Sequence, residues 1–181
     1  MKKNVLIFGS ILGVIISVNL VVTVGLLYSN PDFKANDVVG YAAMVVIFSL
    51  SFFGIRNYRN RQLGGVISFG RAFKTGALIA LLGATIYVVF WLFYYYLAVP
   101  DFMDKYTSHV LANCVKDGYS ATELAEKTIE LREFKKMYDN PLFVVGMTYA
   151  EVLPVGLLVA LISAFILKRK KTPQQPVAGS K

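Results

Sequence analysis

The sequence has almost none of the residues that form cross-links or soft metal sites. Its 181 residues include one cysteine, Cys114, and one histidine, His109. A single cysteine cannot form an intramolecular disulfide, and these two residues alone cannot make a multi-ligand metal cluster. No phosphate loop, nucleophile elbow or nucleophile–base pair is present either. We therefore expect no catalytic residues, no metal and no cofactor.

Charge is also scarce. Only 17% of the residues are charged and 56% are hydrophobic, with a mean hydropathy of +0.55. A water-soluble domain needs more charge to cover its surface. The net charge of +8 would suggest a nucleic-acid partner in a soluble protein. Here the basic residues gather beside long apolar runs, so we expect the partner to be the lipid bilayer and not nucleic acid.

Four apolar runs are long enough to cross a bilayer as helices, which takes about 20 residues. None carries a charged residue except the last, which contains Glu151. None shows the polar stripe of a helix in a soluble bundle. We predict an all-α membrane protein with four transmembrane helices, forming a single domain over residues 1–171. The predicted spans are residues 5–28, 38–55, 75–98 and 142–167.

Small residues recur every four positions in three of the predicted spans. Such rows let helix backbones approach closely in lipid, so they predict packing faces. The rows are Gly9, Gly13 and Ser17 in the first span, Gly76, Ala80 and Ala84 in the third, and Gly156, Ala160 and Ala164 in the fourth.

The connections between spans alternate in charge. Residues 56–74 contain five bases and no acid, whereas residues 101–140 contain six bases and eight acids. Because cytoplasmic loops are enriched in Lys and Arg, we predict that both termini are cytoplasmic. The polar, Pro-containing tail, residues 172–181, should be disordered in the cytoplasm. Anionic lipid headgroups on the cytoplasmic side are expected to contact Arg56, Arg59, Arg61, Arg71 and Lys74.

Residues 101–140 are predicted to form a helical hairpin on the extracytoplasmic face. The sequence SATE predicts a capping box between Ser120 and Glu123 at the start of its second helix. Glu123 and Lys127 are placed to form an i,i+4 ion pair. The aromatic residues before the hairpin, Trp91 and residues 94–96, are typical of a belt at the lipid–water interface.

Three stretches together resemble a known family: GYAAMVVIFSLSFFGIRNYR, GVISFGRAFKTGALIALLGATIYVVFWLFYYY and NPLFVVGMTYAEVLPVGLLVALISAFIL. They are similar to the bacterial integral membrane family called domain of unknown function 4199, frequent in Bacteroidetes. The elements F-G-x-A-F-K and E-x-x-P-V-G carry the most specific part of the likeness. The resemblance implies four spans and a location in the bacterial inner membrane, and it implies no known activity.

Glu151 is the one charged residue inside an apolar run. A charged carboxylate in hydrocarbon costs roughly 2.5–3.5 kcal/mol on insertion scales, so it should be neutral, paired or in contact with water. Counted from the cytoplasmic ends of their spans, Glu151, Asn19 and Tyr87 lie at roughly 24, 22 and 20 Å. The count for Tyr87 starts at Lys74, and Tyr41 falls near the same level. We expect Glu151 to be hydrogen-bonded to Asn19 or Tyr87.

Pro154 lies one turn after Glu151. It removes the hydrogen bond to the Ala150 carbonyl, which predicts a kink and a freed acceptor beside the carboxyl group. The predicted intramembrane polar cluster consists of Glu151, Pro154, Asn19, Tyr87 and Tyr41.

Two functions fit this cluster. It can be a clasp that fixes helix register in a non-enzymatic structural or regulatory membrane protein. Alternatively, Glu151 can bind a proton or cation in a small proton-coupled transporter or channel-like protein. The lack of a second ionisable residue in the spans favours the clasp. A conduit built from four-span subunits would require a homo-oligomer.

Overall fold

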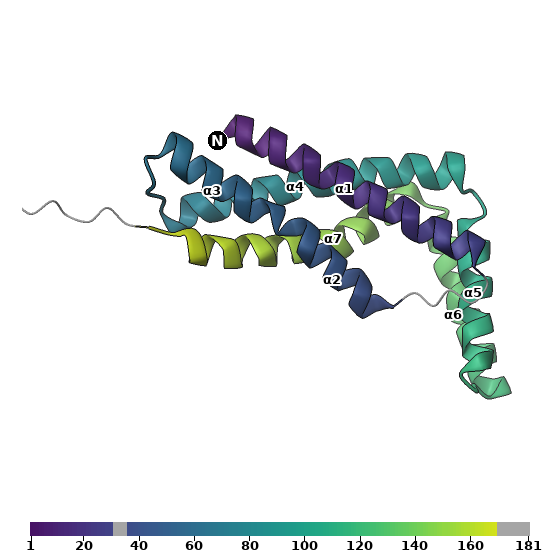
Figure 1. Cartoon of the computed structure of the whole chain (residues 1–181). Helices are drawn as coiled ribbons and strands as arrows, with labels where there is room; N and C mark the ends of the chain where they lie inside the picture. The colour runs from purple at the N-terminus through teal and green to yellow at the C-terminus, as the bar shows by residue number, and fades with distance from the viewer. Residues whose placement is uncertain (31–35, 170–181) are drawn as a thin grey trace, which may run out of the picture.

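The structure is a computed structural model that describes residues 1–30 and 36–169. The predicted disordered tail, residues 172–181, lies outside the described residues, as do residues 31–35. Helices account for nearly all of the described chain (Figure 1). In chain order they are α1 (Lys2–Ser29), α2 (Asp37–Phe48), α3 (Leu50–Gln62), α4 (Phe69–Phe93), the π-helix η1 (Tyr94–Ala98), α5 (Phe102–Lys116), α6 (Ala121–Tyr138) and α7 (Pro141–Leu167).

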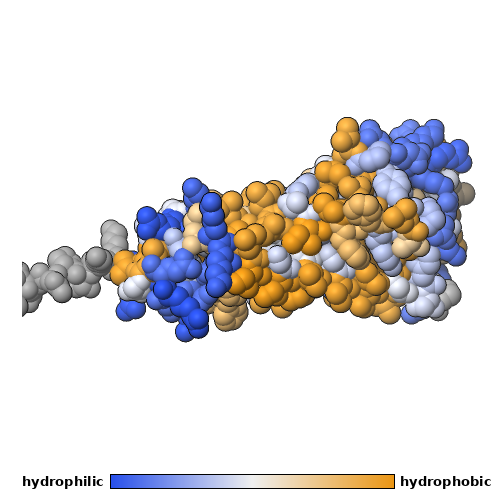
Figure 2. Space-filling model, turned by 90° about the horizontal axis from the view of Figure 1, so that it is seen from above, coloured by the Kyte–Doolittle hydropathy of each residue, from blue (hydrophilic) through white to orange (hydrophobic). Residues whose placement is uncertain are grey.

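Four helical segments are long and apolar enough to cross a membrane. Figure 2 shows an apolar belt along the bundle between two hydrophilic ends. One end carries the N-terminus, the last residues of α7 and the α3–α4 turn, and the other carries α5 and α6 (Figure 1). The predicted all-α membrane fold with four such helices is therefore confirmed. The segments are Lys2–Ser29, Val38–Gln62, Phe69–Ala98 and Pro141–Leu167.

The connection between the second and third spans is shorter than the sequence suggested. The predicted second span ends at Ile55, but α3 continues to Gln62. Just beyond this end lie Gly64 and Gly65, which have φ angles of 62° and 85°, a conformation that glycine adopts without strain. The third span was predicted from residue 75, whereas α4 begins at Phe69. Arginine favours helix, so the basic residues extend these helices and do not end them.

The predicted packing faces are confirmed, and α4 lies at the centre of them. A β-carbon added at Gly76 would come within 2.9 Å of the Ala160 β-carbon on α7. A β-carbon added at Gly13 would come within 2.7 Å of the Ile86 β-carbon on α4. At both places the missing side chain lets two backbones approach, as expected for helices packed in lipid.

The second span is interrupted at Ser49, where α2 ends and α3 begins. The Ser49 hydroxyl donates a hydrogen bond of 2.5 Å to the Val46 carbonyl. Inward from this point Phe48 is fully buried, but Val38, Val39 and Tyr41 are 77%, 64% and 48% exposed. Figure 1 shows α2 diverging from the bundle toward its first residue. The first half of α2 therefore contributes little to the packing of the other spans.

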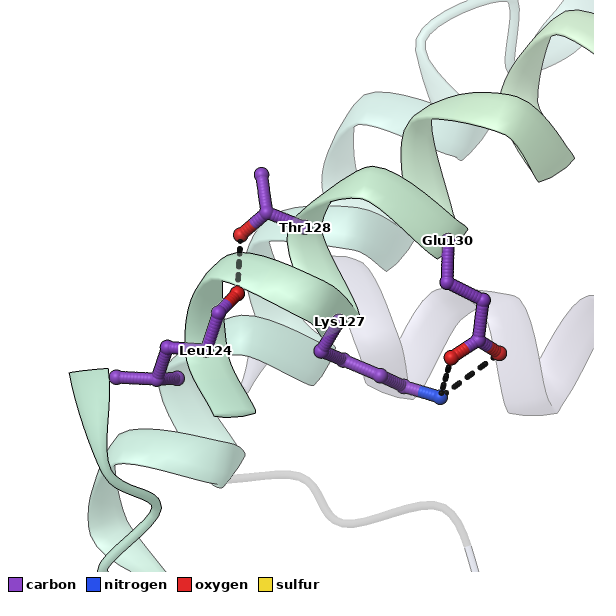
Figure 3. A network of polar contacts seen from close by, with 4 residues as sticks. All are labelled: Leu124, Lys127, Thr128 and Glu130. Carbon is purple, nitrogen blue, oxygen red and sulfur yellow. Dashed lines mark hydrogen bonds and ion pairs between the residues drawn. The ribbon is translucent and has the colours of Figure 1, made fainter. Parts of the chain in front are cut away.

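Helices α5 and α6 pack together and run across the direction of the long helices (Figure 1). The predicted capping box is confirmed, because the Ser120 side chain and the Glu123 carboxylate each bond the other's backbone N–H. The predicted Glu123–Lys127 pair does not form. Lys127 instead pairs with Glu130 at 2.8 Å (Figure 3), since the Glu123 carboxylate is already held by the cap.

The expected aromatic belt is wrong for Trp91 and Tyr95. They are only 5% and 7% exposed and form a cluster of rings between η1, α5 and α6. Trp91 packs on Phe102 with ring centroids 5.1 Å apart, and Tyr95 packs on Tyr138 at 5.8 Å. The Tyr96 hydroxyl also donates a hydrogen bond of 3.3 Å to the Tyr138 carbonyl. These rings attach α5 and α6 to the ends of the spans.

Candidate functional site

The packing of α4 against α7 fixes the depth of Glu151. The two helices are antiparallel, and the close contacts pair Gly76 with Ala160 and Ala80 with Gly156. One residue forward on α4 therefore corresponds to one residue back on α7. This register places Glu151 level with Thr85. Thr85 in turn accepts a 2.8 Å hydrogen bond from the Tyr149 hydroxyl.

Glu151 interacts electrostatically with two tyrosines, one predicted and one not. Tyr87 on α4 is 8% exposed and lies two residues from the level of Glu151. Tyr138 lies at the end of α6, outside the spans. Burial and the charge of Glu151 raise the pKa of Tyr138 from its ordinary 10.0 to about 12. Tyr87 and Tyr138 thus both lie within electrostatic range of Glu151.

Tyr41 lies at the predicted level but on the diverging part of α2. The parallel contacts of the second span with α7 join Phe48 to Gly156 and Arg59 to Leu167, and in both pairs the residue numbers differ by 108. By the same offset Tyr41 lies level with Tyr149, two residues from Glu151. Its side chain is 48% exposed. The depth of Tyr41 therefore fits the predicted cluster, while α2 leads its side chain away from the packed core.

Asn19 does not lie at this level. The close contacts of α1 with α4 pair Gly9 with Leu82 and Gly13 with Ile86, a difference of 73 in each pair. Asn19 is accordingly level with Leu92, five residues or roughly 7.5 Å from Tyr87 toward α5. Its side chain is exposed. The depth count from the sequence failed because it started from Asn4 and Lys74 as if they were level, whereas the α1–α4 register places Asn4 level with Ala77.

Pro154 lies inside α7, which continues as one helix from Pro141 to Leu167. Glu151 and Pro154 are both exposed and share a stripe of α7 with Met147 and Leu158, which are 42% and 55% exposed. An ionisable residue on a lipid-facing stripe requires water, a partner or protonation. The arrangement therefore offers a carboxyl group near two phenols at the edge of the bundle. It offers no metal cluster, because within residues 1–30 and 36–169 no three His, Cys, Asp or Glu residues gather.

A sequence profile of the family described as protein of unknown function (DUF4199) matches residues 7–169. The chain belongs to the DUF4199 family. The match covers most of the first membrane-spanning segment and all of the other three, together with α5 and α6. Neither curated proteins nor solved structures gave a match.

In this DUF4199 protein the predicted lipid-contacting bases take two different positions. Arg59 is partly buried and donates a hydrogen bond of 3.1 Å to the Leu167 carbonyl. It thereby satisfies a terminal carbonyl of α7, where a cation is also favoured by the helix dipole. The other four are exposed and lie on the last turns of α3 and the first turns of α4: Arg56, Arg61, Arg71 and Lys74.

Sequence reasoning missed the polar contacts that hold α1 against α3 and the residues after α7 against the α3–α4 connection in this DUF4199 protein. Asn4 is 4% exposed and donates to the Gly54 carbonyl at 3.2 Å. Gln62 donates to the Asn4 side chain at 3.0 Å and accepts from the N-terminal ammonium at 2.6 Å. Ile67 and Arg169 form an antiparallel bridge. An asparagine just after two lysines gives no signal of burial, because its depth depends on how α1 crosses α3.

Proposed function

We propose that this DUF4199 protein is a non-enzymatic structural or regulatory component of the bacterial cytoplasmic membrane. Both termini lie in the cytoplasm in this proposal, and α5 and α6 lie outside. The segregation of charge carries the proposal. The sequence has eleven Asp and Glu residues, and none occurs in residues 1–30, 38–100 or 152–169. These ranges supply the described residues of the end that carries the N-terminus. An end that is basic without acids is the one retained in the cytoplasm.

Three further polar contacts favour a structural role because each joins two elements of the chain. Tyr28 on α1 donates a hydrogen bond of 2.7 Å to Asp101 before α5. Lys135 on α6 contacts Asp104 on α5. Tyr149 and Thr85 join α7 to α4. Such contacts fix the register and position of helices in a membrane bundle.

Cysteine labelling in whole cells tests the orientation. Cys114 is buried and is first replaced by alanine. In that background a cysteine at exposed Lys116 should react with an impermeant thiol reagent from outside. A cysteine at exposed Arg61 should react only after the cells are opened. Labelling of Arg61→Cys in intact cells, with protection of Lys116→Cys, would reverse the proposed orientation.

A second function, a small proton-coupled transporter or channel-like protein, is favoured by one observation. Glu151 is exposed on the outer side of α7, within the span, and its charge acts on two phenols, Tyr87 and Tyr138. Protein in liposomes under an imposed proton gradient distinguishes the two functions. Proton or solute movement that is lost in Glu151→Gln, with folding unchanged, would support transport. Equal and negligible movement in wild type and Glu151→Gln would support the structural role.

The same exposed stripe of α7 suits contact with a second copy of the chain. The stripe also carries Met147 and Leu158, which are 42% and 55% exposed, and a neighbouring subunit would cover them. We therefore include a homo-oligomer in the proposal. Mass measurement in nanodiscs at several protein-to-lipid ratios tests it, and a monomer at every ratio would contradict it.

A further inference from the structure

A groove of about 370 Å³ opens between α4 and α7. Phe73, Ala77 and Leu81 line it from α4, and Leu153 and Leu157 line it from α7. Phe73, Ala77 and Leu81 are spaced four residues apart on one face of α4. The methyl group of Ala77 leaves a hollow between two larger side chains. From Phe73 to Leu81 the groove extends roughly 12 Å along the helix axis.

Lys74 is the charged residue in the lining of this groove. It is exposed and lies five residues after the start of α4, near the end of the bundle that carries the N-terminus. A lysine at this depth follows an apolar surface with its methylene stem and extends its ammonium group to the headgroup region. The groove therefore has an apolar length and a cationic end.

Further cations lie at the same end. Arg71 is exposed one helical turn before Lys74. Lys168 lies 5.1 Å from the ring centroid of Phe165, which packs against Phe69 at 4.6 Å. Phe69 stacks on Phe73, which lines the groove. No acidic residue occurs in residues 38–100 of the sequence, so the field at this end of the groove is positive.

Both helices that form the groove are membrane-spanning, so the surrounding medium is lipid. Lipid tails are as apolar as leucine, and an apolar groove therefore gains no hydrophobic free energy from them. An empty groove would still lose dispersion contacts along its lining. An acyl chain should fill it, and the choice among lipids should depend on the charge at its end.

We propose that this groove binds one acyl chain of an anionic phospholipid, whose headgroup phosphate contacts Lys74 and Arg71. The site goes beyond the function proposed above and depends only on the membrane location. Lysine and arginine side chains donate hydrogen bonds and accept none. Two of them one helical turn apart therefore suit a phosphate, which presents several acceptor oxygens. Each basic residue near an anionic surface contributes an attraction that corresponds to about fivefold in binding.

Native mass spectrometry after extraction from nanodiscs tests the site. The nanodiscs contain phosphatidylglycerol and phosphatidylcholine in equal amounts. Wild type should retain one phosphatidylglycerol preferentially. Lys74→Gln should lower that preference about fivefold, and Ala77→Phe should remove the retained lipid because its ring fills the hollow. Arg61→Gln is the matched control, since Arg61 is an equally exposed base at the same end but belongs to α3.

Lys74 is exposed, so Lys74→Gln should fold normally, and circular dichroism checks the helix content of every variant. Equal losses in Lys74→Gln and Arg61→Gln would show a diffuse attraction to the basic end and would overturn the site. Unchanged retention in folded Ala77→Phe would overturn the groove as the place where the chain lies. A loss of phosphatidylglycerol retention in Lys74→Gln, with retention unchanged in Arg61→Gln, would support the proposed site.

Discussion

Gly13 of α1 lies so close to Ile86 of α4 that a β-carbon at position 13 would come within 2.7 Å of the Ile86 β-carbon. The same added atom would lie 3.1 Å from the Gly83 carbonyl oxygen. Neither neighbour is the flexible end of a side chain. The two helices can therefore accept a methyl group here only by moving apart.

Gly13→Ala should destabilise the protein by about 1–3 kcal/mol, the usual cost of overpacking. Gly25→Ala on the same helix is the control, because nothing lies within 4 Å of its added β-carbon. It should be neutral or stabilising by up to about 1 kcal/mol through helix propensity. Thermal unfolding in detergent measures both. Equal stability of the two variants would contradict the α1–α4 packing.

The capping box gives a local prediction. Ser120→Ala removes the acceptor for the Glu123 backbone N–H and should cost about 0.5–2 kcal/mol in the first turn of α6. Thr122→Ala, at an exposed position without a cap role, should have little effect. Amide hydrogen exchange of residues 121–125 measures the difference. Unchanged protection in Ser120→Ala would show that the cap contributes nothing to α6.

The apolar runs predicted the four spans because a helix in lipid must satisfy its own backbone and present an apolar surface. The glycine and alanine rows predicted the packing faces for the same local reason. The ends of the spans were less predictable. The second span was predicted to end at Ile55, yet α3 continues to Gln62, just before the glycine pair Gly64–Gly65.

The candidate cluster was predictable in part. The depth of Glu151 and Tyr87 follows from the length of two helices that pack antiparallel, and the register places them two residues apart in level. The error for Asn19 follows from how α1 crosses α4, which only side-chain packing determines. Tyr138 could not be found by counting along the spans, because it lies at the end of α6, outside them, where the charge of Glu151 still acts on it.

The clasp role of Glu151 predicts a pattern of stabilities. Glu151→Gln keeps the shape and most hydrogen bonds and should unfold at nearly the wild-type temperature. Glu151→Leu should lower the free energy of unfolding by about 0.6–2 kcal/mol, the range for polar contacts in membrane bundles. Ile162→Leu, on an exposed part of α7, is the control and should be neutral.

A double-mutant cycle between Glu151→Leu and Tyr87→Phe measures the contact itself. Coupling of about 0.5 kcal/mol or more would show that the two side chains stabilise each other. Additive effects would contradict a clasp between α7 and α4.

Tyr138 reports the charge of Glu151 from outside the spans. Its pKa is about 12 in the folded protein, compared with an ordinary 10.0. Between these values the unfolded chain loses the proton first, so this contribution to stability is complete below pH 10 and falls as the pH rises toward 12. Tyr138→Phe should make the stability less sensitive to pH in that window.

Spectrophotometric titration of the phenols tests the cause of the shift. The difference between wild type and Tyr138→Phe isolates one tyrosine, whose midpoint should lie near 12. In a Glu151→Gln background the same difference should give a lower midpoint, because the repulsion between carboxylate and phenolate is removed. It should stay above 10, since burial is the larger cause. An unchanged midpoint would mean that the Glu151 carboxylate does not lie near Tyr138, and the cluster would then reduce to contacts within the spans.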